Sequence, residues 1–189
     1  SVDDKYIGHP YFEPLYAELN RRRAVVFIHP CYPPGTEADG WDIPRMLIDY
    51  PFETTRVAIN LIFQGVMARY PDIRFILSHS GGTLPFLAHR VSVFDKSTAF
   101  QDNYPDGALA YIKRFWFDTA LSGDAVPLAG LTAVADPSRI LFGTDYPYIS
   151  PDVVTGETRG FDAWDGFTDA QRAAVNRGNA ETMFPRFAG

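Results

Sequence analysis

The chain has 189 residues, 46% of them hydrophobic and 21% charged, an ordinary globular composition that suffices for one sizeable core. Its 23 acidic and 17 basic residues give a net charge of −6, which argues against a nucleic-acid-binding protein and against adhesion to anionic lipid. No apolar run approaches the roughly 18 residues of a membrane span, the N-terminus has no signal pattern, and a single cysteine, Cys31, excludes an internal disulfide framework. We therefore expect a soluble, cytoplasmic protein of one domain.

Helical and extended patterns alternate along the chain. Helices are expected at 11–22, 53–70, 84–100, 106–113, 126–135, 161–167 and 170–184. Residues 52–55 indicate the N-terminal turn of the second helix. Short apolar runs predict buried strands at 24–29, 74–78, 115–118 and 140–142. Strands separated by helices imply right-handed βαβ units and a parallel α/β sheet.

The predicted strands end at side chains that can bind a metal or exchange a proton. These residues, at or just beyond the last strand residue, are His29, His79, Asp118 and Asp145. The carboxyl edge of such a sheet is where α/β enzymes place their active sites. Two histidines and one aspartate, His29, His79 and Asp145, therefore indicate a divalent metal site. Taken singly, each has a structural alternative: a histidine bonded to backbone, a histidine in a Gly-rich turn, or an aspartate in an Asx turn.

Other residues carry weaker signals. His9 lies in a Gly-His-Pro turn, His89 is expected on a helix surface, and nothing near Cys31 predicts a reactive thiol. Gly81-Gly82 matches neither a dinucleotide-binding nor a phosphate-binding loop, and no G-x-S-x-G motif supports a serine hydrolase.

Two aromatic-rich loops, 30–44 and 146–165, are expected to shape a pocket at the strand ends. Trp41 and Tyr148 are the candidate substrate-binding residues from these loops. Further candidates to line the pocket are Tyr32, Ile43, Tyr146 and Trp164. Such side chains suit a planar substrate, and core packing is the alternative explanation for them.

Three segments resemble the amidohydrolase superfamily. They are Val26-Phe27-Ile28-His29-Pro30, Ser78-His79-Ser80-Gly81-Gly82-Thr83-Leu84-Pro85-Phe86 and Phe142-Gly143-Thr144-Asp145-Tyr146-Pro147. They occur in the family's order, and residues 51–55 and 176–180 are also similar to the family. The branch that the chain resembles is the aminocarboxymuconate-semialdehyde decarboxylase-like one, which includes aromatic-acid decarboxylases.

The resemblance implies a metal-dependent (β/α)₈ barrel with one divalent metal, Zn²⁺ first and Mn²⁺ as the alternative. His29 matches a metal ligand at the end of the fifth strand. His79 matches a sixth-strand histidine that assists catalysis, and Asp145 matches an eighth-strand aspartate that ligates the metal or transfers a proton. Arg90 matches an arginine that in some members holds a substrate carboxylate in the neighbouring subunit's site, which implies a homodimer.

One departure from the family is large. The family's first strand carries a His-x-His pair, and this sequence contains none. A full barrel needs about 250 residues and eight strands, whereas four strands are predicted here. We therefore expect residues 1–189 to be the C-terminal half of the barrel, about strands five to eight, with the N-terminal half absent.

The expected activity is metal-dependent, non-oxidative decarboxylation of an aromatic or unsaturated carboxylic acid, such as a hydroxybenzoate. A metal on His29 and Asp145 would bind the substrate, Asp145 or a metal-bound water would handle the proton, His79 would orient that group and Arg90 would hold a carboxylate. Two alternatives stay open at this point. One is a hydrolase or lactonase that uses the same metal site, and the other is a catalytically incomplete fragment.

Overall fold

A computed structural model describes residues 5–33, 43–97 and 99–188. All four predicted strands are confirmed: β1 (Val25–Ile28), β2 (Arg74–Leu77), β3 (Trp116–Asp118) and β4 (Ile140–Leu141). They form one parallel sheet in the order β1-β2-β3-β4, with Val25 opposite Arg74, Ile76 opposite Trp116 and Asp118 opposite Leu141. In an α/β barrel, neighbouring strands of the sheet follow one another along the chain, as they do here. A doubly wound sheet instead reverses its strand order.

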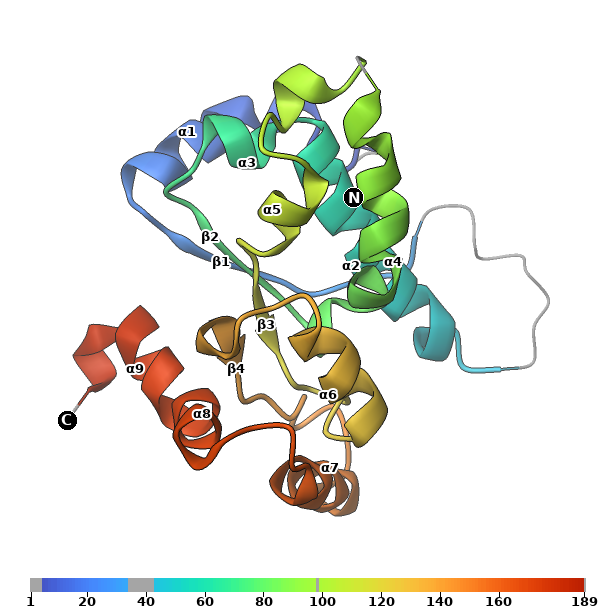
Figure 1. Ribbon diagram of the computed structural model, residues 1–189, viewed down its shortest axis with the longest axis vertical. Helices are drawn as coiled ribbons and strands as arrows, with labels where there is room; N and C mark the ends of the chain where they lie inside the picture. Colours follow the sequence, from blue (N-terminus) through green and yellow to red (C-terminus); the bar gives the residue numbers. More distant parts are fainter. Residues whose placement is uncertain (1–4, 34–42, 98, 189) are drawn as a thin grey trace.

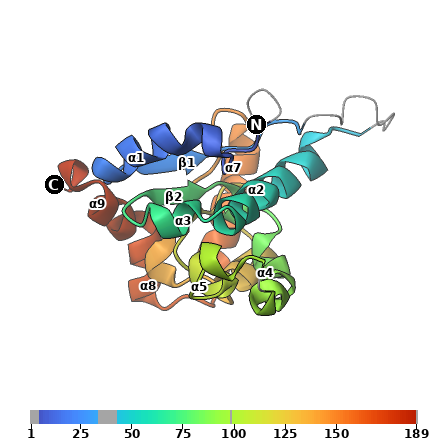
Figure 2. The same ribbon diagram turned by 90° about the horizontal axis from the view of Figure 1, so that it is seen from above.

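Helices precede the first strand, connect the strands and follow the last one. They are α1 (Glu13–Arg21), α2 (Met46–Phe63), α3 (Val66–Arg69), α4 (Leu84–Ser92), α5 (Ala108–Ile112), α6 (Ala125–Thr132), α7 (Pro151–Ala163), α8 (Asp169–Ala173) and α9 (Asn179–Met183). In Figure 1, α1 to α5 occupy the upper part of the molecule and α6 to α9 the lower part, with the sheet between them. Figures 1 and 2 both place α9 on the left, the side at which the strands begin.

The two faces of the sheet are covered unequally. Alternate strand side chains, among them Phe75, Leu77 and Phe117, pack with residues of α1 to α7 in the main core. On the opposite face, Ile76 and Leu141 pack mainly against Met183 of α9. Phe27 of β1 is 53% exposed. One face is thus fully covered by helices, while the other is hollow.

The predicted start of the second helix at 52–55 is wrong. Helix α2 begins at Met46 and contains Pro51, so Glu53, Thr54 and Thr55 lie in its interior and are buried. Proline has a helical φ, and near a helix start it removes only one backbone hydrogen bond. The next turn is held by tertiary contact, because the hydroxyls of Thr55 and Thr83 lie 2.9 Å apart.

The same predicted helix ends earlier than expected, at Phe63. Gly65 adopts a left-handed φ of +70°, which a continuing helix cannot contain, and the short helix α3 starts beyond it. The helix predicted at 84–100 also ends early, at Ser92. A 3₁₀ turn, Val93–Lys96, follows, in which Val93 and Phe94 are exposed, so no apolar face continues the helix.

The helix predicted at 161–167 begins ten residues earlier, so most of the expected loop 146–165 is helix α7. Its start is a local signal, because Ser150 accepts a hydrogen bond from the Val153 backbone N–H and Pro151 occupies the first turn. The helix predicted at 170–184 is confirmed in outline: a π-helical turn, Ala174–Gly178, joins α8 to α9.

The described residues contain no helix of the length and hydrophobicity that a membrane span requires.

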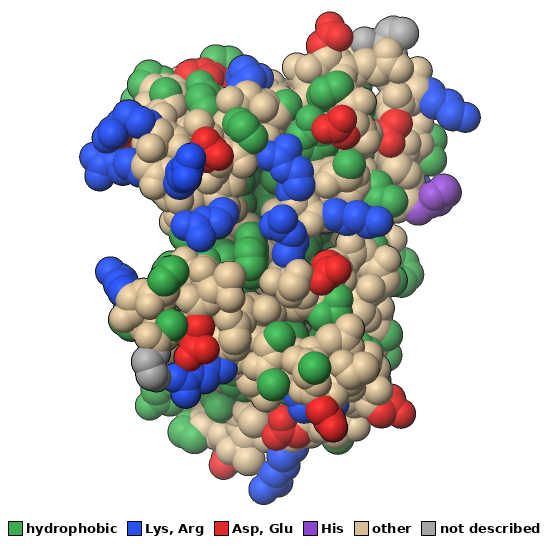
Figure 3. Space-filling view, turned by 60° about the vertical axis from the view of Figure 1, so that its left-hand side comes forward, with side chains coloured by type: hydrophobic (Ala, Val, Ile, Leu, Met, Phe, Trp, Pro, Cys, Tyr) green, Lys and Arg blue, Asp and Glu red, His purple; other side chains and the backbone are tan. Residues whose placement is uncertain are grey.

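Figure 3 brings the left-hand side of Figure 1 forward, the side at which the strands begin. Basic side chains gather there along a crease that crosses the face.

Candidate metal and proton-transfer site

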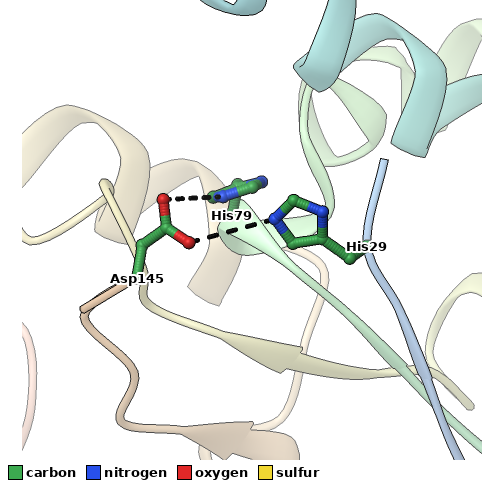
Figure 4. A group of neighbouring side chains, drawn as sticks. All are labelled: His29, His79 and Asp145. Atoms are coloured by element: carbon green, nitrogen blue, oxygen red, sulfur yellow. Dashed lines mark ion pairs between the residues drawn. The ribbon is translucent and has the colours of Figure 1, made fainter. Parts of the chain in front are cut away.

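Three strand-end side chains converge at the carboxyl edge of the sheet. His29 follows β1, His79 follows β2 and Asp145 lies beyond β4, and Figure 4 shows all three pointing toward one another. Asp145 faces both histidines: its Oδ1 is 3.9 Å from His29 Nε2 and its Oδ2 is 3.8 Å from His79 Nε2. The cluster predicted from the sequence is therefore assembled by the parallel sheet.

The hydrogen bond of His29 fixes which ring nitrogen is free. Its Nδ1 lies 2.9 Å from the carbonyl oxygen of Pro30. A carbonyl can only accept, so Nδ1 carries a hydrogen, and Nε2 is the ring nitrogen that faces Asp145. This is the arrangement typical of a metal-ligating histidine, in which a backbone carbonyl sets the tautomer.

His79 is more buried, with 9% of its side chain exposed against 45% for His29. Burial lowers the pKa of His79 and outweighs the opposing attraction of Asp145. The imidazole is therefore neutral near pH 7 and can accept a proton or donate a lone pair. Its Nδ1 is buried and has no hydrogen-bond partner in the described part of the chain.

The spacing within the cluster suits a shared cation. Separations of 3.8 and 3.9 Å are too long for hydrogen bonds. An ion bound at about 2.1 Å from each ligand would hold its donors roughly 3 to 3.5 Å apart. One donor atom from each of the three residues lies within 4.8 Å of the others. Two imidazoles and a carboxylate thus need only a small adjustment to ligate one divalent metal.

Two members of the cluster have a strained backbone. His79 (φ 55°) and Asp145 (φ 64°) adopt the left-handed conformation, which is uncommon for residues other than glycine. Such conformations cost about 1–3 kcal/mol each and persist where neighbouring contacts impose them. The turn that contains His79 is closed by a hydrogen bond of 2.9 Å from the Gly82 N–H to the His79 carbonyl oxygen. Gly82 itself is tightly packed, because a Cβ atom there would lie 2.0 Å from the Pro51 carbonyl oxygen.

Asp118 also holds the His79 turn. It was expected at a strand end from the sequence but was assigned no role in the site. Its Oδ1 accepts the His79 backbone N–H at 2.7 Å and the Ala120 N–H at 3.1 Å. Burial raises the pKa of Asp118 to about 6, against the two backbone hydrogen bonds, which lower it. The available signal was its position at a strand end, the same as that of the cluster residues.

A cavity of about 590 Å³ opens in front of the cluster and is walled mainly by apolar side chains. Tyr146 and Tyr148 line it, as the sequence predicted. Phe184, which follows α9, also lines it, and Tyr50 packs edge-on against His29 at 6.0 Å. Neither of these two was predicted, because both depend on how distant helices fold back onto the sheet.

Other predicted pocket residues lie elsewhere. Arg90 is exposed in the last turn of α4 and does not line the cavity of its own chain. Trp164 packs on Phe167 in the main core, with ring centroids 4.6 Å apart, and is not a pocket residue. Tyr32 and Ile43 do not line the cavity, and Trp41 lies outside the described residues.

Comparison with known proteins identifies what this arrangement is similar to. The profile of a family described as "Amidohydrolase" matches residues 3–186. The chain is 38% identical over 185 residues to the 6-methylsalicylic acid decarboxylase of Penicillium expansum, which covers 97% of this chain and 57% of that protein. It is 29% identical to the 2-amino-3-carboxymuconate-6-semialdehyde decarboxylase of Dictyostelium discoideum, over 83% of this chain and 44% of that protein. The chain thus spans about half the length of these curated relatives.

The fold comparison agrees with the sheet topology. The structure superposes with a TM-score of 0.79 on the dihydroxybenzoic acid decarboxylase of Polaromonas sp. JS666, over 95% of this chain and 55% of that chain, at 22% identity. That enzyme was crystallised with manganese and the inhibitor 2-nitroresorcinol. The parallel α/β fold expected from the sequence, part of a barrel, is therefore confirmed.

Proposed function

The chain belongs to the amidohydrolase family, in its aminocarboxymuconate-semialdehyde decarboxylase-like branch, and from this premise we propose that the whole protein is a metal-dependent, non-oxidative decarboxylase of a hydroxybenzoate-like acid. The observation that carries the proposal is the convergence of His29, His79 and Asp145 on one point at the mouth of an apolar cavity. The named activities of the similar proteins supply the reaction class.

We further propose that this chain supplies the last four strands of a closed barrel. Two features of the sheet support this. In the described part of the chain, β1 and β4 each pair with one strand only, which leaves two open edges. The hollow face also exposes Phe27, a large apolar side chain that further strands would cover.

In this proposal His29 and Asp145 ligate the metal, and the remaining ligands come from outside this chain. His79 lies beside the metal and is not assigned as a ligand. A bound divalent cation supplies charge neutralisation for the carboxylate and phenol oxygens of the substrate. Imidazole and carboxylate donors accept both zinc and manganese. We propose zinc and treat manganese, which the similar Polaromonas enzyme binds, as the alternative that metal analysis of the purified protein decides.

The chain's own residues would handle the proton. Decarboxylation breaks the bond between the ring carbon and the carboxyl carbon, CO₂ leaves, and the electron pair on the ring carbon takes up a proton. That proton comes from solvent water. We assign its relay to the ring carbon to Asp145, with the neutral imidazole of His79, 3.8 Å away, as the neighbouring group that orients Asp145. Tyr146 and Tyr148 on the cavity wall suit a planar ring.

Arg90 enters the proposal only through a second subunit. It is exposed and off the cavity wall, so it cannot hold substrate in its own chain's site as described. We propose a homodimer in which Arg90 reaches the partner's site and pairs with a carboxylate. We also propose a cytoplasmic location, supported by the acidic net charge of −6 and the single, unpaired cysteine, and tested by cell fractionation.

The deciding experiment supplies the whole protein with 6-methylsalicylate or 2,6-dihydroxybenzoate in D₂O. We expect CO₂ and a phenol carrying one deuterium at the carbon that lost the carboxyl group. Asp145→Asn and His79→Asn should lower turnover by on the order of 100-fold or more. The control is His9→Asn. His9 is exposed, and its side chain accepts a hydrogen bond from the Tyr11 backbone N–H, a role that asparagine can also fill.

Two results would contradict the proposal. Net addition of water to a lactone or amide without CO₂ release would identify a hydrolase of the same superfamily. A metal-loaded, folded protein that releases no CO₂ from either acid would identify a catalytically incomplete protein.

A further inference from the structure

A second, smaller cavity lies at the opposite end of the sheet, where the strands begin. It has a volume of about 180 Å³, and its polar wall consists of three arginines and one tryptophan: Arg74, Arg114, Arg139 and Trp116. Arg74 is the first residue of β2, Arg139 directly precedes β4, and Arg114 lies two residues before β3. Parallel strands start at the same edge, so three consecutive strands bring their arginines together.

No carboxylate of the described residues forms an ion pair with these arginines, whose side chains are all half-buried. Asp136 lies near Arg139, whose charge adds to the Ser138 hydrogen bonds that lower the pKa of the Asp136 carboxyl group. The hydrogen bonds of the three arginines go to backbone carbonyls. Arg74 donates to Met183 and Arg23, Arg139 donates to Arg114 at 3.0 Å, and Arg114 donates to Pro71 at 3.5 Å.

Carbonyl acceptors orient the guanidinium groups without removing their charge. Like charges held together and partly withdrawn from water repel one another and lose hydration, which costs free energy unless an anion joins them. The chain carries six more acidic than basic residues, so acidic groups were available to it. None of the described acidic groups pairs with all three arginines, so the cluster keeps a net positive charge that an anion could offset.

Trp116 provides an independent observation. Its Nε1 is buried and has no hydrogen-bond partner in the described part of the chain, although its ring lies on the wall of the same cavity. A buried N–H left without an acceptor is rare and costs about 1–3 kcal/mol. The guanidinium of Arg139 stacks over the Trp116 ring at 5.4 Å, which fixes both groups beside the cavity. The site thus brings three guanidinium groups together beside an N–H that has no acceptor.

We propose that this cavity binds a small oxyanion, a phosphate or carboxylate group, held by Arg74, Arg114 and Arg139 and by the Trp116 Nε1–H. Guanidinium forks match the geometry of oxyanions, and a volume of about 180 Å³ suits a small anion. The site lies at the opposite end of the strands from His29, His79 and Asp145. It is therefore distinct from the candidate decarboxylase site and does not depend on the proposed function. Figure 3 shows the open, basic crease on this side of the molecule.

Titration of the whole protein with inorganic phosphate, at constant ionic strength, tests the proposal. The readout is the indole N–H resonance of Trp116 in a ¹⁵N NMR spectrum, assigned with Trp116→Phe. We expect a saturable shift of this resonance, and a parallel titration with benzoate separates phosphate from carboxylate as the preferred group. Arg139→Gln should weaken binding at least tenfold, whereas Arg159→Gln, which removes an exposed arginine of α7, should leave it unchanged.

Three outcomes would overturn the proposal. One is that neither phosphate nor benzoate shifts the Trp116 resonance of the unmodified, folded protein. This result is expected if an acidic side chain from outside this chain fills the cavity. Another is a shift that grows linearly without saturating. The third is equal weakening by Arg139→Gln and Arg159→Gln, which would show a general charge effect. If Arg139→Gln does not fold, Arg139→Lys replaces it as the test variant, because lysine keeps the positive charge and lacks the two-pronged guanidinium group. Undiminished phosphate binding by Arg139→Lys would also count against the site.

Discussion

Replacing Asp118 by asparagine should change how stability depends on pH. Asp118 is 7% exposed, and its Oδ1 accepts the backbone N–H groups of His79 and Ala120. An asparagine side-chain oxygen can accept both bonds in the same place. Asp118→Asn therefore keeps the hydrogen bonds and removes the buried charge that forms when the carboxyl group ionises.

The size and sign of the effect follow from the pKa of Asp118, which burial raises from 3.8 to about 6. The unfolded chain ionises this carboxyl group at the lower pH, so between pH 4 and 6 the folded state binds more protons than the unfolded state. The free energy of unfolding then falls as pH rises through this window. At about 1.4 kcal/mol per pKa unit, Asp118 lowers stability by about 3 kcal/mol at pH 7 relative to pH 3.

The assay is urea unfolding of the metal-free protein, in chelator, from pH 3.5 to 8. We expect Asp118→Asn to gain about 3 kcal/mol of unfolding free energy over the unsubstituted protein between pH 3.5 and pH 8. Asp162→Asn, at an exposed position, controls for the loss of one charge. A constant difference between Asp118→Asn and the unsubstituted protein across this range would refute the argument that the buried carboxyl group titrates near pH 6.

Three further predictions concern packing, hydrogen bonding and the metal. Gly82→Ala places a Cβ atom 2.0 Å from a backbone oxygen at a residue with φ +64°, and should lower the free energy of urea unfolding by at least about 3 kcal/mol. Gly130→Ala, at a glycine with open space around it, should be neutral or stabilise by up to about 1 kcal/mol. Equal effects of the two substitutions would refute the close approach at Gly82. Asn179→Ala removes the amide N–H groups that reach the buried carbonyl of Ile140 at 2.7 Å and the half-buried carbonyl of Pro137 at 2.8 Å. The loss should cost about 2–3 kcal/mol, and an unchanged Tm would mean that water replaces the amide. Chelation should lower the Tm of the whole protein, and added Mn²⁺ or Zn²⁺ should restore it. His29→Ala should abolish most of the Tm difference between the metal-free and the metal-loaded protein. A full Tm response to metal in that variant would remove His29 from the ligand set.

Local patterns in the sequence determined the strands and the side chains at their ends. The apolar runs at 24–29, 74–78, 115–118 and 140–142 predicted parallel strands, and all four were confirmed. Of these strands, β1 is the least buried in this chain, with Phe27 53% exposed. Because such strands end at one edge, the predicted meeting of His29, His79 and Asp145 followed from the chain order alone. The motifs of the amidohydrolase superfamily agreed with this placement.

Only the tertiary structure decided where several helices begin and end and what supports the site. Helix α2 continues through Pro51 because its next turn is buried against the β2–α4 connection, a contact between residues far apart in sequence. The left-handed backbone of His79 depends on Asp118, 39 residues away along the chain, and no local pattern specifies it. The arginines at the other end of the sheet look like ordinary surface residues in the sequence, because their shared cavity exists only once three strands start side by side. Hydrophobic periodicity reports which face of a segment is buried, but the identity of the group packed against that face is a property of the folded chain.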